Sequence, residues 1–248
     1  MSEMNRSIDL RSDPRAAELA ANLAAVRLRV DRACAAAGRP SGEVSVVVVT
    51  KFFPAADVRR LAALGVRDLG ENRAQEAASK FAEVRSDTPG LRLHFIGQLQ
   101  TNKAGVVAGI ADVVHAVDRP ALVRALDRAA AAHDKRLTVL LQVSLEADPG
   151  GAARRGGADP ADVVGLAEMV DQSGALELGG VMAVAPLGAD PDEAFARLAE
   201  VAASVRAVQP AATWISAGMS GDLEAAVRHG ATHLRVGTAI LGSRPTLR

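Results

Sequence analysis

A run of valines near residue 45 constrains the fold of this chain more than any other feature. Val44 and Val46–Val49 are separated only by Ser45. A strand with one face in water alternates apolar and polar residues, whereas a parallel strand covered on both faces is apolar throughout. The run therefore predicts a buried parallel strand over Val44–Thr50, as found in α/β folds.

Lys51 follows this strand directly, at the end where α/β folds place their chemistry. In an apolar mouth an ammonium group loses hydration, which lowers its pKa and frees the amine as a nucleophile. Such an amine can form a Schiff base with an aldehyde. A lysine at a strand end more often extends into water, and this segment by itself favours that simpler interpretation.

At 248 residues the chain can form two small domains or one large α/β domain, and because no segment is long or biased enough for a linker we expect a single domain over residues 1–248. Apolar residues make up 49% of the chain, and 29 basic residues balance 29 acidic ones. This balance disfavours nucleic acid or a membrane surface as the main partner. Residues 1–13 contain no apolar signal-peptide core and are expected to form a disordered tail. We expect a cytoplasmic protein in which Cys34, the single cysteine, is a buried thiol.

Apolar runs and amphipathic segments alternate along the whole chain. After the first strand, strands are expected at Arg67–Leu69, Leu91–Ile96, Asp112–Val117, Leu137–Ser144, Gly180–Ala185, Thr213–Ala217 and Thr232–Val236. Helices are expected at Pro14–Ala37, Ala55–Leu64, Ala74–Arg85, Asn102–Ala108, Pro120–Ala132, Pro160–Gln172, Pro191–Val208 and Asp222–His229, and a short turn begins at Ala239. Asp13 should cap the first helix and Asn72 can cap the third. These units favour a single closed (β/α)8 barrel with an extra N-terminal helix. A doubly wound open sheet is the alternative, although no G-x-G-x-x-G motif supports its dinucleotide-binding form.

The loops after the seventh and eighth strands are rich in small residues. Residues 216–221 read SAGMSG and residues 235–238 read RVGT. In (β/α)8 barrels these two loops commonly build a phosphate site, where glycines let backbone N–H groups approach an anion and Ser220 and Thr238 offer hydroxyls. Either loop alone is equally well explained as a turn with a helix cap. Both together, with Lys51 at the first strand, favour a phosphate site.

Arg235 lies between two apolar residues of the eighth strand, so alternation turns it to the opposite face, near the barrel mouth. A buried guanidinium needs a ligand or a carboxylate, and the sequence leaves both open. His94 and His115 lie in strands, where hydrogen-bonded core histidines are commoner than metal ligands. With one cysteine and no H-E-x-x-H motif, no metal site is expected. The sequence contains no G-x-S-x-G motif, so nothing in it indicates a hydrolase with a Ser-His-Asp triad.

Several motifs in order resemble the YggS/PROSC family, the pyridoxal phosphate homeostasis proteins. They are VVTKFFP, DLGENRAQE, HFIGQLQTNK, GVMAVAP and ISAGMSGDLEAAVRHGATHLRVGTAILG, spanning residues 48–242. The resemblance implies a barrel like the N-terminal domain of alanine racemase that holds pyridoxal 5′-phosphate (PLP). Lys51 resembles the family's Schiff-base lysine, Asn72 lies in its G-E-N motif near the cofactor, and Arg235 resembles the arginine facing the pyridine nitrogen. The family's phosphate site is similar to Ser220 with backbone groups around Met219, Gly237 and Thr238.

The loop after the fifth strand departs from the family pattern. Many relatives carry a lysine before its glycine, whereas residues 152–157 here read AARRGG. The resemblance therefore does not extend to a role for that lysine in passing on the cofactor.

The sequence also separates a cofactor carrier from a catalyst. A permanently protonated arginine keeps the pyridine nitrogen unprotonated and the ring a weak electron sink. The second base of alanine racemase is a tyrosine beside an additional β-domain, and this chain contains no tyrosine. We therefore expect a monomeric protein that binds, buffers and delivers PLP, with apo PLP-dependent enzymes as recipients and without robust turnover. A PLP-dependent amino-acid racemase is the alternative, and an interaction module that merely keeps the fold is the third class.

Overall fold

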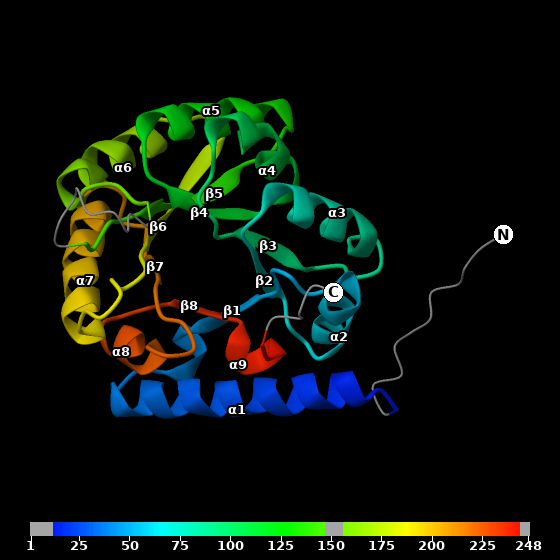
Figure 1. Cartoon of the computed structure of the whole chain (residues 1–248). Coiled ribbons are helices and arrows are strands. Elements are labelled where there is room, and N and C mark those ends of the chain that lie inside the picture. Colours follow the sequence, from blue (N-terminus) through cyan, green and yellow to red (C-terminus); the bar gives the residue numbers. More distant parts are fainter. Residues whose placement is uncertain (1–11, 147–155, 244–248) are drawn as a thin grey trace.

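The computed structural model of the chain describes residues 12–146 and 156–243. Its centre is a closed barrel of parallel strands in sequence order, with β1 also pairing with β8 (Figure 1). The strands are β1 Ser45–Val49, β2 Asp68–Glu71, β3 Arg92–Phe95, β4 Val113–Val117, β5 Leu137–Gln142, β6 Leu176–Met182, β7 Trp214–Ser216 and β8 His233–Val236. The predicted (β/α)8 barrel is confirmed, because an open doubly wound sheet would leave two strand edges unpaired.

Helices cover the outside of the barrel (Figure 1). They are α1 Pro14–Ala36, α2 Ala55–Ala63, α3 Ala74–Val84, α4 Ala104–Ile110, α5 Pro120–Ala132, α6 Val163–Asp171, α7 Pro191–Val208, α8 Leu223–Arg228 and α9 Thr238–Leu241, with 3-10 turns at Ser41–Glu43, Thr101–Lys103 and Pro160–Asp162. The bounds of α5 and α7 are those predicted, and most other helices differ by one or two residues at an end. Two 3-10 turns occupy the expected starts of α4 and α6.

Two strands differ from the prediction in an informative way. β6 begins at Leu176 and not at Gly180. Glycine commonly interrupts strands, but here Gly179 and Gly180 lie inside the strand. A Cβ at Gly180 would lie 2.0 Å from the carbonyl oxygen of Trp214, so glycine lets β6 pass close to β7. β2 runs on to Glu71, beyond the predicted end at Leu69, and so delivers the G-E-N motif to the rim of the barrel.

The helix α1 lies across the outside of the barrel, beside α2, α8 and α9 (Figure 1). As predicted, the carboxylate of Asp13 caps it by accepting hydrogen bonds from the backbone N–H groups of Arg15 and Ala16. Its apolar residues recur at helical spacing and form one buried face, which includes Leu19, Leu23, Val26 and Val30. This face attaches α1 to the last elements of the chain.

Two expectations from the sequence fall outside the described residues. They concern most of the predicted N-terminal tail, residues 1–11, and most of the divergent loop after the fifth strand, residues 147–155. Within the described ranges, no helix has both the length and the apolar character required to cross a membrane.

Candidate functional site

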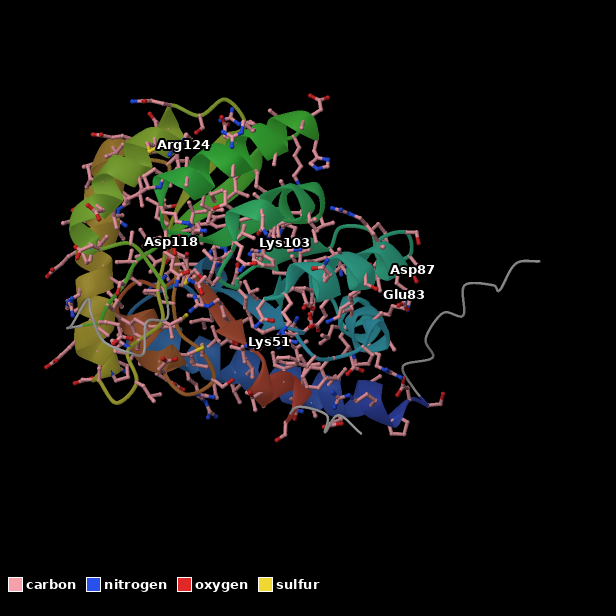
Figure 2. All side chains as sticks on the ribbon, turned by 45° about the horizontal axis from the view of Figure 1, so that its top comes forward. Lys51, Glu83, Asp87, Lys103, Asp118 and Arg124 are labelled. Carbon is pink, nitrogen blue, oxygen red and sulfur yellow. The ribbon has the colours of Figure 1, made fainter. Side chains whose placement is uncertain are left out.

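Lys51 lies where β1 ends, at the mouth of the barrel and next to the strand that leads into α9 (Figure 2). Its side chain is half-buried, and its Nζ lies 6.0 Å from the ring centroid of Phe52. Phe52 has a φ of 71°, a left-handed conformation that is costly for an aromatic residue. The loop that carries Lys51 is therefore strained and needs contacts that hold it.

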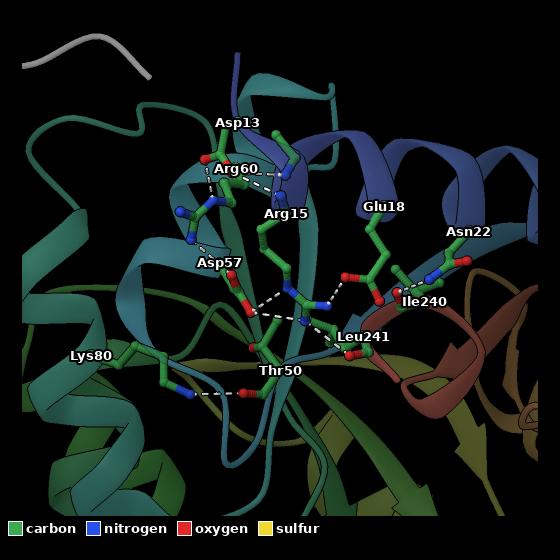
Figure 3. Close-up of polar contacts among 11 residues, drawn as sticks. Asp13, Arg15, Glu18, Asn22, Thr50, Asp57, Arg60, Lys80, Ile240 and Leu241 are labelled. Carbon is green, nitrogen blue, oxygen red and sulfur yellow. Dashed lines mark hydrogen bonds and ion pairs between the residues drawn. The ribbon is translucent and has the colours of Figure 1, made fainter. Parts of the chain in front are cut away.

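A polar cluster supplies those contacts and consists of the buried residues Thr50, Glu71 and Lys80 with the partly exposed Glu76. The Nζ of Lys80 donates to the carbonyl oxygen of Thr50 at 2.9 Å (Figure 3) and to Oε1 of Glu71 at 2.6 Å. The hydroxyl of Thr50 donates to the same Glu71 oxygen at 2.7 Å. The N–H of Phe52 donates to Oε1 of Glu76 at 2.6 Å, which also lies 3.2 Å from Lys80 Nζ. The cluster thus holds the backbone on both sides of Lys51.

Glu71 and Asn72 each retain an unused acceptor beside this loop. Glu71 is fully buried, and burial raises the pKa of its carboxyl. Among the described residues, neither Oε2 of Glu71 nor Oδ1 of Asn72 has a hydrogen-bond partner, and both atoms are buried. The interpretation of Asn72 as a helix cap is wrong, because Arg73 occupies the cap position of α3 without a side-chain bond.

A close backbone approach fixes the position of Asn72. A Cβ at Gly97 would lie 2.2 Å from the carbonyl oxygen of Asn72, so only glycine allows the loop after β3 to pass there. The backbone of Asn72 is therefore packed against this loop, and its side-chain oxygen is buried without a partner among the described residues. A buried amide oxygen without a partner points to a group that a ligand would supply.

The two loops predicted to bind phosphate meet at the mouth. Oγ of Ser220, after β7, accepts a hydrogen bond from the N–H of Ala239 in α9 at 3.4 Å, so Ser220 lies beside the Gly237–Thr238 turn. At Gly218, φ is +88° and a Cβ would lie 2.6 Å from that of Ala226. The N–H of Met219 is already engaged by the Asp222 carboxylate at 2.6 Å. The structure therefore gathers Ser220, Gly237 and Thr238, whereas the Met219 amide has another partner.

The helix α1 holds these loops from outside through their backbone carbonyls. Arg29 makes a bidentate ion pair with Glu224, at 2.8 and 3.0 Å, and donates to the carbonyl oxygen of Ser220 at 3.1 Å. Asn22 donates to the carbonyl of Ile240 at 3.0 Å, and Arg15 donates to that of Leu241 at 2.9 Å (Figure 3). The extra N-terminal helix thus contributes to the geometry of the predicted phosphate site. Nothing in its sequence indicated this, because the contacts end on main-chain oxygens far along the chain.

Arg235 is buried inside the barrel, as its alternation predicts, with 5% of its surface exposed. Its Nη1 donates to Oγ of Ser216 at 2.7 Å and its Nη2 to the carbonyl oxygen of Ala183 at 2.8 Å. Burial lowers the pKa of its guanidinium to about 10, which still leaves the group protonated at neutral pH. Among the described residues no carboxylate oxygen lies within ion-pair distance of it, so the carboxylate alternative left open by the sequence is not realised there.

Sequence reasoning missed the cluster around Lys80 and the role of Ser216. Glu76 and Lys80 are four residues apart on α3, and this spacing was a usable signal for an ion pair on one helix face. Ser216 offered no signal beyond its place in SAGMSG. In the described ranges, no group of three or more His, Cys, Asp or Glu side chains is arranged to hold a metal ion.

Comparison with known proteins places this geometry in a family. The family described as alanine racemase, N-terminal domain, matches residues 21–245. A pyridoxal phosphate homeostasis protein of Mycobacterium tuberculosis is 46% identical over 95% of this chain and 97% of its own length. The structure of PipY from Synechococcus elongatus with PLP bound is 36% identical, with a TM-score of 0.78 over 90% of this chain and all of that one.

A more distant likeness shows the fold alone. Alanine racemase from Corynebacterium glutamicum is 15% identical, with a TM-score of 0.68 over 94% of this chain and 63% of that one. The family match and the close relatives together show that this chain belongs to the alanine racemase N-terminal domain family and, within it, to the pyridoxal phosphate homeostasis proteins, the YggS/PROSC family.

Proposed function

We propose that this chain binds PLP at the mouth of its barrel, with Lys51 as the lysine that forms the Schiff base. The main supporting observation is that Lys51 and Asn72 follow the neighbouring strands β1 and β2 at the same rim, where Asn72 keeps a buried amide oxygen without a partner among the described residues. When bound, PLP supplies an aldehyde with which a lysine amine condenses, releasing one water. The close relative PipY, which has PLP bound in its structure, supports the same ligand for this chain.

The remaining candidate residues fit the other parts of this ligand. Ser220, with the backbone of Gly237 and Thr238, offers hydroxyl and N–H donors to a phosphate, and Met219 lines the same loop. The guanidinium of Arg235 is a donor suited to an unprotonated ring nitrogen. The amide of Asn72 can present its oxygen or, rotated by 180°, its nitrogen to a hydroxyl on the ring.

The same residues favour storage and delivery over catalysis. Because Arg235 stays protonated at neutral pH, with a pKa of about 10, it donates to a ring nitrogen but does not protonate it, so the ring withdraws electrons weakly. The chain also lacks the tyrosine that serves racemases as the second base. We infer a PLP-buffering and PLP-delivering protein, with apo PLP-dependent enzymes as recipients. The racemase remains the competing function, favoured only by the shared fold.

Covalent trapping tests the binding site. After incubation with PLP and borohydride reduction, peptide mapping by mass spectrometry should find the pyridoxyl group on the peptide containing Lys51. Lys51→Ala should abolish this adduct and remain folded, while Lys103→Ala, a change at another half-buried lysine on the same rim, should retain it. An adduct confined to Lys80, Lys103 or Lys135 would show that Lys51 is not the Schiff-base residue.

Turnover tests the choice between carrier and racemase. Purified protein loaded with PLP and incubated with L-amino acids in deuterated water should show neither racemisation nor deuterium at Cα at enzymatic rates. Turnover of about 1 per second or more would establish the racemase function instead.

Cofactor transfer and size test the remaining expectations. An apo PLP-dependent enzyme should regain activity faster with the loaded protein than PLP is released into a trap. Equal rates would indicate a store without active delivery. Light scattering coupled to gel filtration should give the mass of a monomer.

A further inference from the structure

A chain of hydrogen bonds runs through the interior of the barrel and ends on Arg235. Nε2 of His94 lies 2.9 Å from Oδ1 of Asp68, and Nδ1 of His94 lies 2.9 Å from Nε2 of His115. Nδ1 of His115 lies 3.0 Å from Oγ of Ser216, which accepts from Arg235. The five side chains come from β2, β3, β4, β7 and β8. The chain thus connects a carboxylate at the first residue of β2 with the guanidinium near the mouth.

The contacts allow an order in which every donor in this chain points towards Asp68. Oγ of Ser216 accepts from the guanidinium, so its own O–H can donate to Nδ1 of His115. A neutral His115 then carries its proton on Nε2 and donates to Nδ1 of His94, whose Nε2–H donates to the carboxylate. Burial holds the pKa of His115 well below its usual value, in keeping with a neutral ring. Hydrogen bonds aligned in this way polarise and strengthen one another.

One further proton on His94 would reverse part of this order, because His115 would then donate to Ser216. That arrangement would add a third cation to Arg235 and Arg92, and the Nε of Arg92 already contacts Oδ1 of Asp68 at 2.7 Å. The imidazole of His233, 6.2 Å from that of His94, adds no negative charge. We assign the order that starts from Arg235, because Ser216 accepts from the guanidinium and its O–H then has Nδ1 of His115 as its acceptor.

Asp68 lies at the opposite end of the barrel from Lys51. Its side chain is 12% exposed and paired with Arg92, which is half exposed, whereas His94 and His115 are fully buried. Hydrogen bonding to His94 and to Arg92 holds the pKa of Asp68 at about 2 against the opposing effect of burial. A fixed anion therefore stands at the far end of a chain whose other end is a buried cation.

We propose that Asp68 is a positioning residue for Arg235, acting through His94, His115 and Ser216 to orient the guanidinium towards the PLP ring. The proposal rests on the proposed function for the role of Arg235, but the hydrogen-bond chain itself belongs to the ligand-free protein. Removing the charge at Asp68 should loosen Arg235 although four hydrogen bonds separate the two side chains. A residue that only stabilised the lower barrel would leave Arg235 unchanged.

The first experiment uses the ligand-free protein and histidine and arginine side-chain NMR. In the wild type we expect His94 and His115 to carry their protons on Nε2. Asp68→Asn should shift the resonances of His115 and of the Arg235 guanidinium as well as those of His94. Arg92→Gln removes the other partner of Asp68 and should leave the Arg235 resonances near their wild-type positions. A His115 protonated on Nδ1 in the wild type, or an Asp68→Asn effect confined to His94, would overturn the proposal.

The second experiment is a double-mutant cycle on PLP affinity and on the absorbance of the bound cofactor. Asp68→Asn and Ser216→Ala should each weaken binding by about three- to tenfold, within the range of couplings in hydrogen-bonded networks. The double variant should bind as weakly as Ser216→Ala alone, because the chain is already broken. Effects that multiply would show that Asp68 does not act through Ser216 and would overturn the proposal.

The experiments distinguish a failure of the proposed function from a failure of the hydrogen-bond chain. If the wild type does not bind PLP, the proposed function fails, while the ligand-free spectra still decide the hydrogen-bond chain. If Asp68→Asn does not fold, Ser216→Ala tests the chain from the other end and should shift both His115 and Arg235. Unchanged His115 resonances in that variant would overturn the proposal.

Discussion

The two sides of the barrel mouth are held in different ways. The Lys51 loop is held by residues close in sequence: Lys80 lies 30 positions from Thr50, and Glu76 lies 24 positions from Phe52. The Ser220 and α9 side is held by α1, across 191 positions from Arg29 to Ser220 and 226 from Arg15 to Leu241. In the first set Lys80 and Glu71 are buried charges and Glu76 is partly exposed, whereas the second set consists of partly exposed side chains that donate to backbone carbonyls.

We expect the contacts on the Lys51 side to stabilise the mouth more strongly than those from α1. The Lys80–Glu71 pair is desolvated, so losing one partner strands the other charge in a buried site. Each α1 contact is individually modest because water can replace it, but together they join the first helix to the last elements of the barrel. We therefore expect single changes on the Lys51 side to cost stability, and those on the α1 side to cost little.

The largest effect should come from Lys80→Met. The change leaves Glu71 buried without its cation, which should lower the free energy of unfolding by about 3–5 kcal/mol. Denaturant unfolding monitored by circular dichroism measures this loss. Lys103→Met, at a less buried lysine, is the control and should cost less than about 1 kcal/mol. A loss at Lys80 as small as that of the control would contradict a supporting role for the cluster.

Acidification should destabilise the protein through the β4 and β8 side, whereas Glu71 on the Lys51 side acts in the opposite direction. Burial lowers the pKa of His115 well below 6.5 and that of His233 to about 4. Below pH 6.5 the unfolded chain therefore binds more protons than the folded one, and stability falls as the pH falls. The free energy of unfolding should then fall by up to about 1.4 kcal/mol per pH unit for each histidine.

The pH prediction is checked by unfolding at several pH values between 7 and 5. His233→Asn should flatten the slope, while His133→Gln, at the exposed end of α5, should not. Glu71 contributes in the opposite direction, because its raised pKa means that acidification favours the folded state. A slope unchanged by His233→Asn would refute this assignment.

On the phosphate side, Ser220→Ala should weaken PLP binding by roughly 10- to 100-fold. The change removes a hydroxyl donor to a charged acceptor, worth about 1.5–3 kcal/mol. Titration with pyridoxal, which lacks the phosphate, is the matched control, and its affinity should not change. Equal binding of pyridoxal and PLP by the wild type would show that these loops do not hold a phosphate.

The smallest effect should come from Arg29→Gln on α1. The ion pair with Glu224 is more than one third exposed on both sides, so its loss should cost about 0.5–1 kcal/mol of stability. PLP affinity should fall by about two- to fivefold, because Ser220 loses one support for its carbonyl. Arg32→Gln, on the exposed face of the same helix, is the control. If Arg29→Gln weakened PLP binding as much as Ser220→Ala, the contacts from α1 would not be the weaker support that we expect.

The sequence by itself determined the barrel and the position of its chemistry. Strand and helix periodicity are local properties, so the valine run, the Asp13 cap and the order of the β/α units could be predicted from neighbouring residues. Lys51 and the Ser220 and Gly237–Thr238 loops follow strands, and parallel strands present their carboxyl ends on one rim. Their common location was therefore predictable, whereas their roles towards PLP remain predictions.

Only the tertiary structure decided which side chains meet. The closed sheet brings Asp68, His115 and Arg235 into one hydrogen-bonded chain across 167 positions, from 68 to 235, and no local pattern encodes that register. The same holds for α1 on the Ser220 carbonyl, for the Met219 amide held by Asp222, and for Asn72, whose expected capping role is replaced by a buried, unused oxygen. The physical reason is that periodicity fixes the face on which a side chain lies, whereas barrel closure fixes its partner.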